Sequence, residues 1–325
     1  MSKAGFVTII GKPNVGKSTL MNTLIGQKIA ITSYKPQTTR KQVRTIYTDE
    51  NGQIVFIDTP GLQKGKDHLA KYMYEASLST LKEVDLILVL VEPKLVRRDK
   101  NSTSDDPADL VPKDEKEVIR LAEKAADKTP VVLVITKVDT VPRDALLPIL
   151  SSYSALWKKD TGKELADLVP VSARRKQGIE DLKKTIFSYL PEGEPFYGED
   201  EVTTETEREI AQDIIREKAL RLLQEEVPHG IAVKINRMKY RTAKAGEEIC
   251  DIDADVLCER EAHKGIIIGK GGEMLKKIGT AARTDIEEMI GTKVNLKLFV
   301  RVRRDWKDDP ALLKSLGYNE KDLKQ

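Results

Sequence analysis

The sequence predicts a doubly wound α/β domain with a mostly parallel sheet, followed by a smaller α+β domain. Its 325 residues are enough for about two domains. Up to residue 190, apolar runs alternate with segments of helical spacing, which is typical of parallel βαβ units. Beyond a Pro-, Gly- and acid-rich stretch, the pattern changes to α-β-β-α-α-β. We place the domains at 1–190 and 205–304, with a linker at 191–204 and a tail at 305–325.

The composition is that of an ordinary protein of a reducing compartment. The formal net charge is only +3, so overall charge does not by itself demand a nucleic-acid partner. Cys250 and Cys258 share one face of a predicted strand, and we expect core residues rather than a disulfide or a metal pair. Residues 1–4 lead at once into a strand and no apolar run is long enough to span a membrane. We expect a cytoplasmic protein without a signal peptide.

In the first domain, short apolar runs predict buried strands, and the segments between them predict helices. Helical spacing is clearest at 18–24, 117–126 and 179–189. The predicted strands are 6–10, 54–57, 84–91, 131–135 and 168–171. Polar motifs follow most of these strands directly, and parallel sheets bind ligands at the carboxyl ends of their strands.

The first of these motifs is a phosphate loop. It fits the pattern G-x-x-x-x-G-K-[ST] and consists of Gly11, Lys12, Pro13, Asn14, Val15, Gly16, Lys17 and Ser18. Backbone N–H groups of such a loop, at the start of the helix that contains Thr19, attract phosphate oxygens. Lys17 is expected to reach the β- and γ-phosphates, and the Ser18 hydroxyl to hold Mg²⁺. The alternative is a glycine-rich turn that binds nothing.

The second motif is Asp58-Thr59-Pro60-Gly61, which follows its strand without a gap. The Asp58 carboxylate is placed to hold Mg²⁺ through water, and the Gly61 N–H to sense the γ-phosphate. Taken alone, these four residues also make a common turn.

The third motif is predicted to select the base. Asp139, in Thr136-Lys137-Val138-Asp139, can accept hydrogen bonds from the N1–H and N2–H groups of guanine, which adenine lacks on that edge. The stem of Lys137 can lie on the base plane. In Ser172-Ala173-Arg174, the Ala173 N–H is placed to donate to guanine O6. The alternative is a charged loop after a strand.

Together these residues resemble GTPases of the Ras-like superfamily, in the branch that contains Era, MnmE and Der. Gln37-Thr38-Thr39-Arg40-Lys41 resembles switch I of that branch, which implies that Thr39 ligands Mg²⁺ in the GTP state. The resemblance implies hydrolysis of GTP to GDP, with Lys17, Thr39 and Gly61 supporting the transition state. Thr136 stands where the common motif has asparagine, and we expect a weakened link from this side chain to the phosphate loop.

Leu62 stands where Ras-like enzymes carry a water-orienting glutamine. Hydrolysis should therefore be slow or depend on another group. In the potassium-dependent relatives that this loop resembles, the asparagine at position 14 helps to ligate a K⁺ ion. Asn14 is therefore a candidate K⁺ ligand, the alternative being a residue that only ties the loop to switch I. Residues 92–115 are polar and are predicted to be a flexible surface insertion whose role the sequence does not show.

The second domain resembles an RNA-binding KH domain of the bacterial type, type II. Helical spacing at 205–224 is followed by predicted strands at 230–240 and 247–259, a helix that ends near 290 and a strand at 294–302. The loop Gly269-Lys270-Gly271-Gly272 is the G-x-x-G element that clamps about four nucleotides in such domains. Ile266, Ile267 and Ile268 are expected to form an apolar floor for bases, and Lys276 to add positive charge. A tight turn is the alternative.

This domain order resembles the Era family over nearly the whole chain. The resemblance implies a monomer that binds small-subunit ribosomal RNA near its 3′ end, assists maturation of the 30S subunit and makes peripheral contact with the inner face of the cell membrane. A constitutive RNA-binding chaperone with a structural nucleotide is the alternative function. A P-loop kinase is disfavoured, because residues 136–139 would have no role in one.

Overall fold

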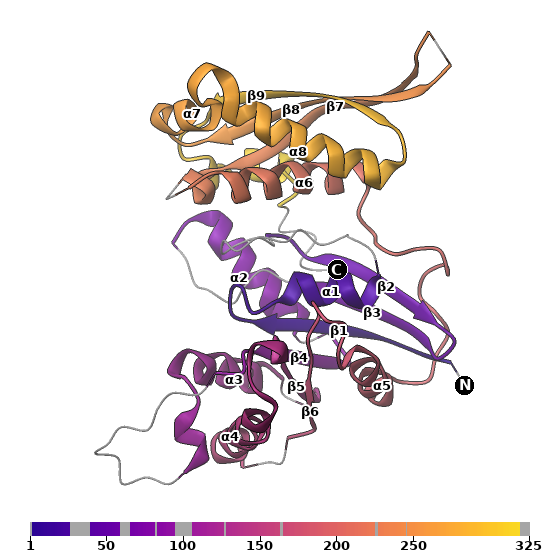
Figure 1. Cartoon of the computed structure of the whole chain (residues 1–325), viewed down its shortest axis with the longest axis vertical. Coiled ribbons are helices and arrows are strands. Elements are labelled where there is room, and N and C mark those ends of the chain that lie inside the picture. Colours follow the sequence, from indigo (N-terminus) through magenta and orange to yellow (C-terminus); the bar gives the residue numbers. More distant parts are fainter. Residues whose placement is uncertain are drawn as a thin grey trace. The chain divides into compact units, whose positions relative to one another are not determined.

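The computed structural model describes residues 2–26, 40–58, 66–81, 83–94, 106–126, 128–162, 165–224, 227–244 and 246–318. The chain divides into two compact units (Figure 1). The first extends to Thr204 and the second begins at Glu205, apart from short segments before residue 73 that group with the second.

The elements up to residue 190 alternate between strands and helices, except that β2 is followed directly by β3. Short 3₁₀ turns lie at Pro107–Leu110 and Val138–Thr140. In chain order the strands and α-helices are β1 (Lys3–Gly11), α1 (Lys17–Ile25), β2 (Val43–Asp49), β3 (Gly52–Asp58), α2 (His68–Thr80), β4 (Leu86–Val91), α3 (Lys113–Ala126), β5 (Val131–Ile135), α4 (Arg143–Thr161), β6 (Asp167–Pro170) and α5 (Ile179–Tyr189).

These strands form one sheet in the order β2-β3-β1-β4-β5-β6. Neighbouring strands are parallel except β2, which runs antiparallel to β3 at the edge. The prediction of a mostly parallel doubly wound sheet is therefore confirmed. The five predicted strands are present, and β2 was not predicted because Val-Arg-Thr-Ile-Tyr-Thr-Asp is no apolar run.

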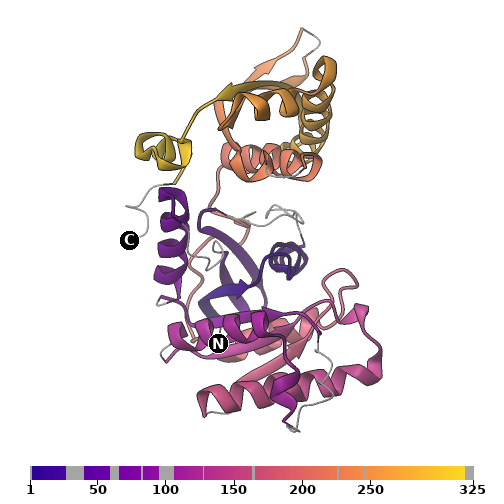
Figure 2. The same cartoon turned by 90° about the vertical axis from the view of Figure 1, so that its left-hand side faces the viewer.

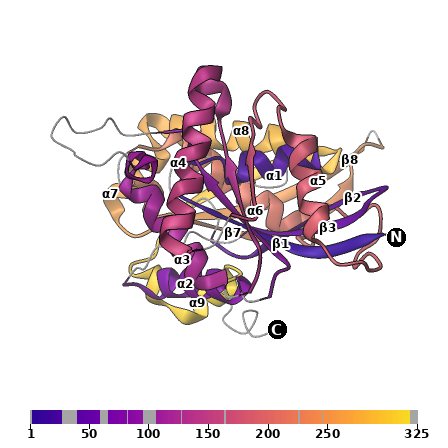
Figure 3. The ribbon, with the colours of Figure 1, turned by 90° about the horizontal axis from the view of Figure 1, so that it is seen from below.

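Helices cover both faces of the sheet, so the strands between them are buried on both sides (Figure 3). Leu20 and Met21 of α1 and Leu182 of α5 join the core on one face. Ile119 of α3 and Tyr153 of α4 join the core on the other. This arrangement holds the carboxyl ends of β1, β3, β4 and β5 along one edge, where the predicted motifs begin.

The second unit is a three-stranded sheet with helices on one face (Figure 2). Its strands are β7 (Ala232–Thr242), β8 (Glu248–Cys258) and β9 (Lys293–Val302), in the order β7-β8-β9. β7 and β8 are antiparallel, and β8 and β9 are parallel. Cys250 and Cys258 are buried and unbridged on β8, as predicted. Its elements are α6 (Glu207–Leu222), β7 (Ala232–Thr242), β8 (Glu248–Cys258), α7 (Glu261–Ile268), α8 (Glu273–Ile290), β9 (Lys293–Val302) and α9 (Pro310–Ser315), with 3₁₀ turns at Val227–Gly230, Lys270–Gly272 and Trp306–Asp308.

The predicted linker, residues 191–204, is bound to the first unit, and we call it the strap. Its last residues lie along the outer edge of β2. The N–H of Ile46 donates to the carbonyl of Val202 at 2.9 Å, and the N–H of Thr204 donates to the carbonyl of Arg44 at 3.3 Å. The strap therefore covers backbone groups that an edge strand would otherwise expose.

A buried glutamine holds the middle of the strap. Gln53 of β3 is fully buried, and its Oε1 accepts from the N–H groups of Phe196 and Tyr197 at 2.8 and 3.0 Å. Its Nε2 donates to the carbonyl of Tyr197 at 2.9 Å. The aromatic ring of Phe196 packs on Phe6 with ring centroids 4.7 Å apart. A free linker would make none of these contacts.

The tail is also folded in part. Trp306 is fully buried and its Nε1–H donates to the carbonyl of Gly230 at 3.0 Å. Asp309 caps α9 by accepting from the N–H groups of Ala311 and Leu312. Residues 306–318 therefore pack as part of the second unit.

Candidate functional site

The phosphate loop joins β1 to α1, as predicted. A Cβ atom on Gly11 would lie 2.7 Å from the carbonyl oxygen of Leu90, so only glycine fits there. Asn14 and Gly16 both have positive φ, 65° and 108°, which turns the chain sharply before Lys17 starts the helix. The backbone N–H groups of the first helical turn are thereby left for a ligand.

Lys17 folds back into this loop. Its Nζ donates to the carbonyls of Gly11 and Lys12 at 2.8 and 2.9 Å. Burial lowers the pKa of Lys17, and the negative charge of Asp58 works against that shift. The ammonium group is thus positioned over the loop, where a phosphate would meet it.

The candidate Mg²⁺ ligands that the structure describes fit a hard cation. Asp58 ends β3 opposite Ile9 in the parallel register, is almost fully buried, and is close enough to Lys17 for their charges to interact. Ser18 lies in the first turn of α1. Carboxylate and hydroxyl oxygens at one edge are the donor types that Mg²⁺ prefers. Gln37, Thr38, Thr39 and residues 59–62 lie outside the described residues.

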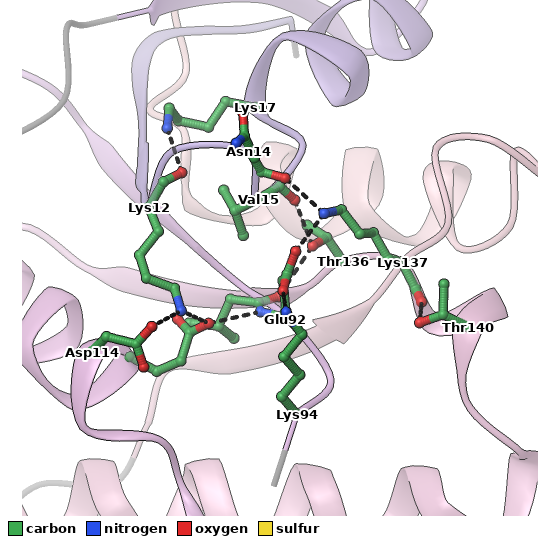
Figure 4. Close-up of polar contacts among 12 residues, drawn as sticks. Lys12, Asn14, Val15, Lys17, Glu92, Lys94, Asp114, Thr136, Lys137 and Thr140 are labelled. Carbon is green, nitrogen blue, oxygen red and sulfur yellow. Dashed lines mark hydrogen bonds and ion pairs between the residues drawn. The ribbon is translucent and has the colours of Figure 1, made fainter. Parts of the chain in front are cut away.

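Thr136 keeps a link to the phosphate loop (Figure 4). Its hydroxyl lies 2.8 Å from the carbonyl of Val15 and 3.2 Å from the carbonyl of Val91, and both contacts are buried. A hydroxyl has one hydrogen, which these two acceptors share. The shorter threonine side chain therefore still reaches the loop, and a link weaker than that of asparagine stays a prediction.

The base-recognition loop is organised by two side chains. Lys137 has a φ of 53°, and its Nζ donates to the carbonyl of Asn14 at 2.6 Å. Asp139 accepts a 2.6 Å hydrogen bond from the hydroxyl of Ser172. This hydrogen bond holds the pKa of Asp139 below its ordinary value. The carboxylate is therefore ionised near neutral pH, as recognition of two guanine donors requires.

The G-x-x-G loop lies between α7 and α8, also as predicted. Gly269 combines a φ of 73° with a ψ of 173°, and a Cβ atom there would lie 2.7 Å from the Cβ of Met274. Gly271 and Gly272 have φ values of 60° and 82°, although a Cβ atom on either would meet no neighbour. The first glycine is required by space, and the other two by backbone conformation. Lys270 is exposed at this turn.

Comparison with known proteins gives the same division of the chain. Residues 6–137 match a family described as 50S ribosome-binding GTPase, and residues 226–307 match the KH domain family. GTPase Era of Lactobacillus delbrueckii subsp. bulgaricus is 46% identical over 321 residues, 99% of this chain and 98% of the relative. GTPase Era of Clostridium kluyveri is 43% identical and covers 98% of this chain and 100% of the relative. The chain belongs to the Era family of GTPases.

Solved structures of Era proteins are similar over the full length. A crystal structure of Era in complex with MgGDPNP and nucleotides 1506–1542 of 16S ribosomal RNA superimposes with a TM-score of 0.85 at 38% identity, covering 98% of this chain and 100% of that one. An Aquifex aeolicus Era variant bound to GDP·AlF4⁻ gives a TM-score of 0.84 at 38% identity, with 98% and 99% covered. The Era fold of a GTPase domain followed by a KH domain is confirmed.

One predicted RNA contact in this Era-family chain is wrong. Ile267 is fully buried in the core between the helices and the sheet, so it offers no surface to a base. Its neighbour Ile266 is 48% exposed, and Ile268 is partly exposed. Helical periodicity explains the difference, because consecutive residues of α7 point in directions about 100° apart. Lys276 is exposed on α8.

Sequence reasoning missed the acidic partners of the Era-family loops. The side chain of Lys12, a residue of the predicted phosphate loop, pairs with Asp114 at 2.5 Å and Glu115 at 2.7 Å, at the start of α3 (Figure 4). Glu92, directly after β4, pairs with Lys137. These carboxylates belong to the two ends of the predicted insertion, so those ends are ordered against the loops. Residues 95–105 of the insertion lie outside the described residues.

Proposed function

We propose that the chain binds GTP and Mg²⁺ at its first domain, hydrolyses GTP, and uses the nucleotide state to control binding of small-subunit ribosomal RNA by its second domain. The observation that carries this proposal is the presence, on one chain, of an ordered phosphate loop with its base-recognition loop and an ordered G-x-x-G loop. Family membership over the whole length adds support, because a relative was crystallised with both MgGDPNP and nucleotides 1506–1542 of 16S ribosomal RNA.

Each predicted site residue has a chemical task in this proposal. The phosphate loop and Lys17 bind and neutralise the phosphates, and Asp139 selects guanine. Ser18 and Asp58, with Thr39, would hold Mg²⁺, which neutralises charge on the phosphate oxygens when it is bound. The family resemblance implies the roles of Gly61, Leu62 and the switch I residues 37–41, and the proposal keeps them unchanged. Gly269–Gly272 and Lys276 would grip the RNA backbone.

The deciding experiment compares RNA affinity in two nucleotide states. The 37-nucleotide RNA that corresponds to positions 1506–1542 is titrated with the protein in the presence of GDPNP or GDP. We expect tighter binding with GDPNP. Equal affinity in the two states, together with no GTP turnover, would instead favour a constitutive RNA-binding chaperone with a structural nucleotide.

The family resemblance also leads us to propose a cytoplasmic monomer that assists maturation of the 30S subunit and contacts the membrane peripherally. In the described part of the chain, no helix is long and apolar enough to cross a membrane. Fractionation of cells that express the tagged protein, with and without high salt, tests the membrane contact.

A further inference from the structure

Glu92 lies between the two loops of the nucleotide site but belongs to neither motif. It follows β4 directly, at the same sheet edge as the phosphate loop and the base-recognition loop (Figure 4). Its side chain is 12% exposed. A nearly buried carboxylate needs partners, and those of Glu92 define its role.

The carboxylate of Glu92 accepts hydrogen bonds from the ammonium groups of Lys137 and Lys94. Burial works to raise the pKa of Glu92, but the pairs with the two lysines outweigh it and hold this pKa below its ordinary value. Glu92 therefore stays charged and attracts Lys137 strongly.

The ammonium group of Lys137 binds a second partner at the same time. It donates to the backbone carbonyl of Asn14 at 2.6 Å. Glu92 therefore holds Lys137 in the position from which it supports the phosphate loop. The same restraint fixes the aliphatic stem of Lys137, the part expected to lie on the guanine plane.

The backbone of Glu92 is itself fixed. Its carbonyl accepts a 2.8 Å hydrogen bond from the hydroxyl of Tyr153, which is fully buried on α4. Its N–H lies 3.4 Å from Oε1 of Glu115, the carboxylate that pairs with Lys12. Glu92 is thus linked to the phosphate loop in two ways. Its side chain reaches the carbonyl of Asn14 through Lys137, and its backbone reaches the ammonium group of Lys12 through Glu115.

We infer that Glu92 is a positioning residue for bound guanine nucleotide, acting through Lys137. This inference rests on the proposed nucleotide site. The carboxylate holds Lys137 against the phosphate loop before nucleotide arrives, so that binding does not have to order this lysine. Loss of the carboxylate should speed nucleotide release.

The test is a double-mutant cycle on the rate of GDP release. The release rate of a fluorescent GDP is measured by stopped flow for the full chain and for Glu92→Gln, Lys137→Met and the double variant. Because a charge-assisted hydrogen bond is lost, we expect release from Glu92→Gln to be about tenfold faster. In the Lys137→Met background, the same substitution should change release by less than about twofold.

Additive effects of the two substitutions on the GDP release rate would overturn the inference, because a Glu92 that only stabilises the fold would change this rate whether or not Lys137 is present. An unchanged release rate in Glu92→Gln would overturn it as well. Lys94→Ala is the matched control, since it removes the other cation of Glu92, and its release rate should stay within about twofold of the parent. If Glu92→Gln does not fold, Glu92→Asp, which withdraws the carboxylate by one methylene, is measured in the same cycle with the same criteria. A parent protein that binds no GDP would instead refute the proposed function.

Discussion

The hydroxyl of Ser172 lies 2.6 Å from Oδ1 of Asp139 and donates a hydrogen bond to it. The two residues follow neighbouring parallel strands, β6 and β5. Ser172 is fully buried, so the bond fixes the carboxylate from its protein side. Guanine recognition therefore depends on a carboxylate that is already oriented and charged.

Asp139→Asn should exchange guanine preference for xanthine preference. The amide keeps one oxygen acceptor but puts an NH₂ donor where the carboxylate accepted from guanine N2–H, and this donor matches the carbonyl that xanthine presents at its 2-position. Competition of GTP, XTP and ATP against a fluorescent nucleotide measures the exchange. A variant that retains parental GTP affinity would show that the base pocket is elsewhere.

Thr136→Val should weaken GDP binding about fivefold. The substitution removes the hydrogen bond to the carbonyl of Val15 at nearly constant volume, at a cost of about 1 kcal/mol. Thr136→Asn is the control, because its amide can donate to the same carbonyl, and we expect affinity near that of the parent. Isothermal titration with GDP compares the two. Equal losses in both variants would contradict a role for this hydrogen bond.

Most strands of the first domain could be predicted from the sequence, because a strand that is buried on both faces forms a continuous apolar run. β2 was not predicted because it is an edge strand with several polar residues, of which Arg44 is exposed and Thr48 and Asp49 are partly exposed. α4 contains Pro148, which disfavours a helix interior, yet packing of Ile149, Tyr153 and Leu156 on the sheet overrides that cost. The strap resembled a linker because Pro, Gly and acidic residues do not reveal backbone pairing with a distant strand.

The site was predictable where a motif lies in one stretch of chain and was not where it depends on distant partners. Lys17 and Asp139 were found because spacing and strand position carry their roles. Glu92 and Glu115 lie in a segment read as an insertion, and no local pattern links them to Lys137 or Lys12. Ile267 was misplaced because an apolar run of three residues does not show which side of its helix faces the core.

Potassium should accelerate GTP hydrolysis relative to sodium at equal ionic strength. A cation held by Asn14 would stabilise the negative charge of the transition state, as an arginine finger does in other GTPases. Asn14 has a positive φ, so Asn14→Ala, which should abolish the potassium effect, also introduces strain. Asn14→Gly avoids this strain, and we expect the same loss. Asn14→Asp keeps an oxygen ligand and should retain the preference.

Phosphate release in KCl and in NaCl measures this prediction. Identical rates for the parent protein in the two salts would exclude the ion mechanism without affecting the nucleotide site.

Replacing Lys270 and Gly271 by aspartate should weaken RNA binding by about 2 kcal/mol or more, roughly 30-fold. Carboxylates at an exposed loop repel phosphate. A side chain at Gly271 would meet no neighbour, and aspartate is one of the residues that tolerate its left-handed φ of 60°, so the fold should survive. Gel-shift titration with the 16S-derived RNA measures the loss. GTP binding is the internal control and should not change. RNA affinity equal to that of the parent would remove the G-x-x-G loop from the interface.

Gln53→Ala should destabilise the first domain by about 2 kcal/mol. The substitution leaves the N–H groups of Phe196 and Tyr197 without their acceptor and opens a space beneath the strap. Chemical denaturation measures the loss, and limited proteolysis should show faster cleavage within residues 191–204. Gln53→Met keeps most of the volume but offers no acceptor, and it should leave the strap about as open to cleavage as alanine does. Cleavage that is equally slow in all three proteins would contradict the role of Gln53.

The strap also determines how much chain is free to act as a tether. Thr204 is bonded to β2, and Thr206 is already the N-cap of α6, with a capping box to Glu209, so Glu205 alone separates the two anchored residues. A flexible linker of about fourteen residues would allow a mean end-to-end distance of about 20 Å. Because residues 202 and 204 are hydrogen-bonded to β2, this segment is not a random coil. Random-coil statistics therefore do not set the effective concentration that each domain experiences of the other's ligand.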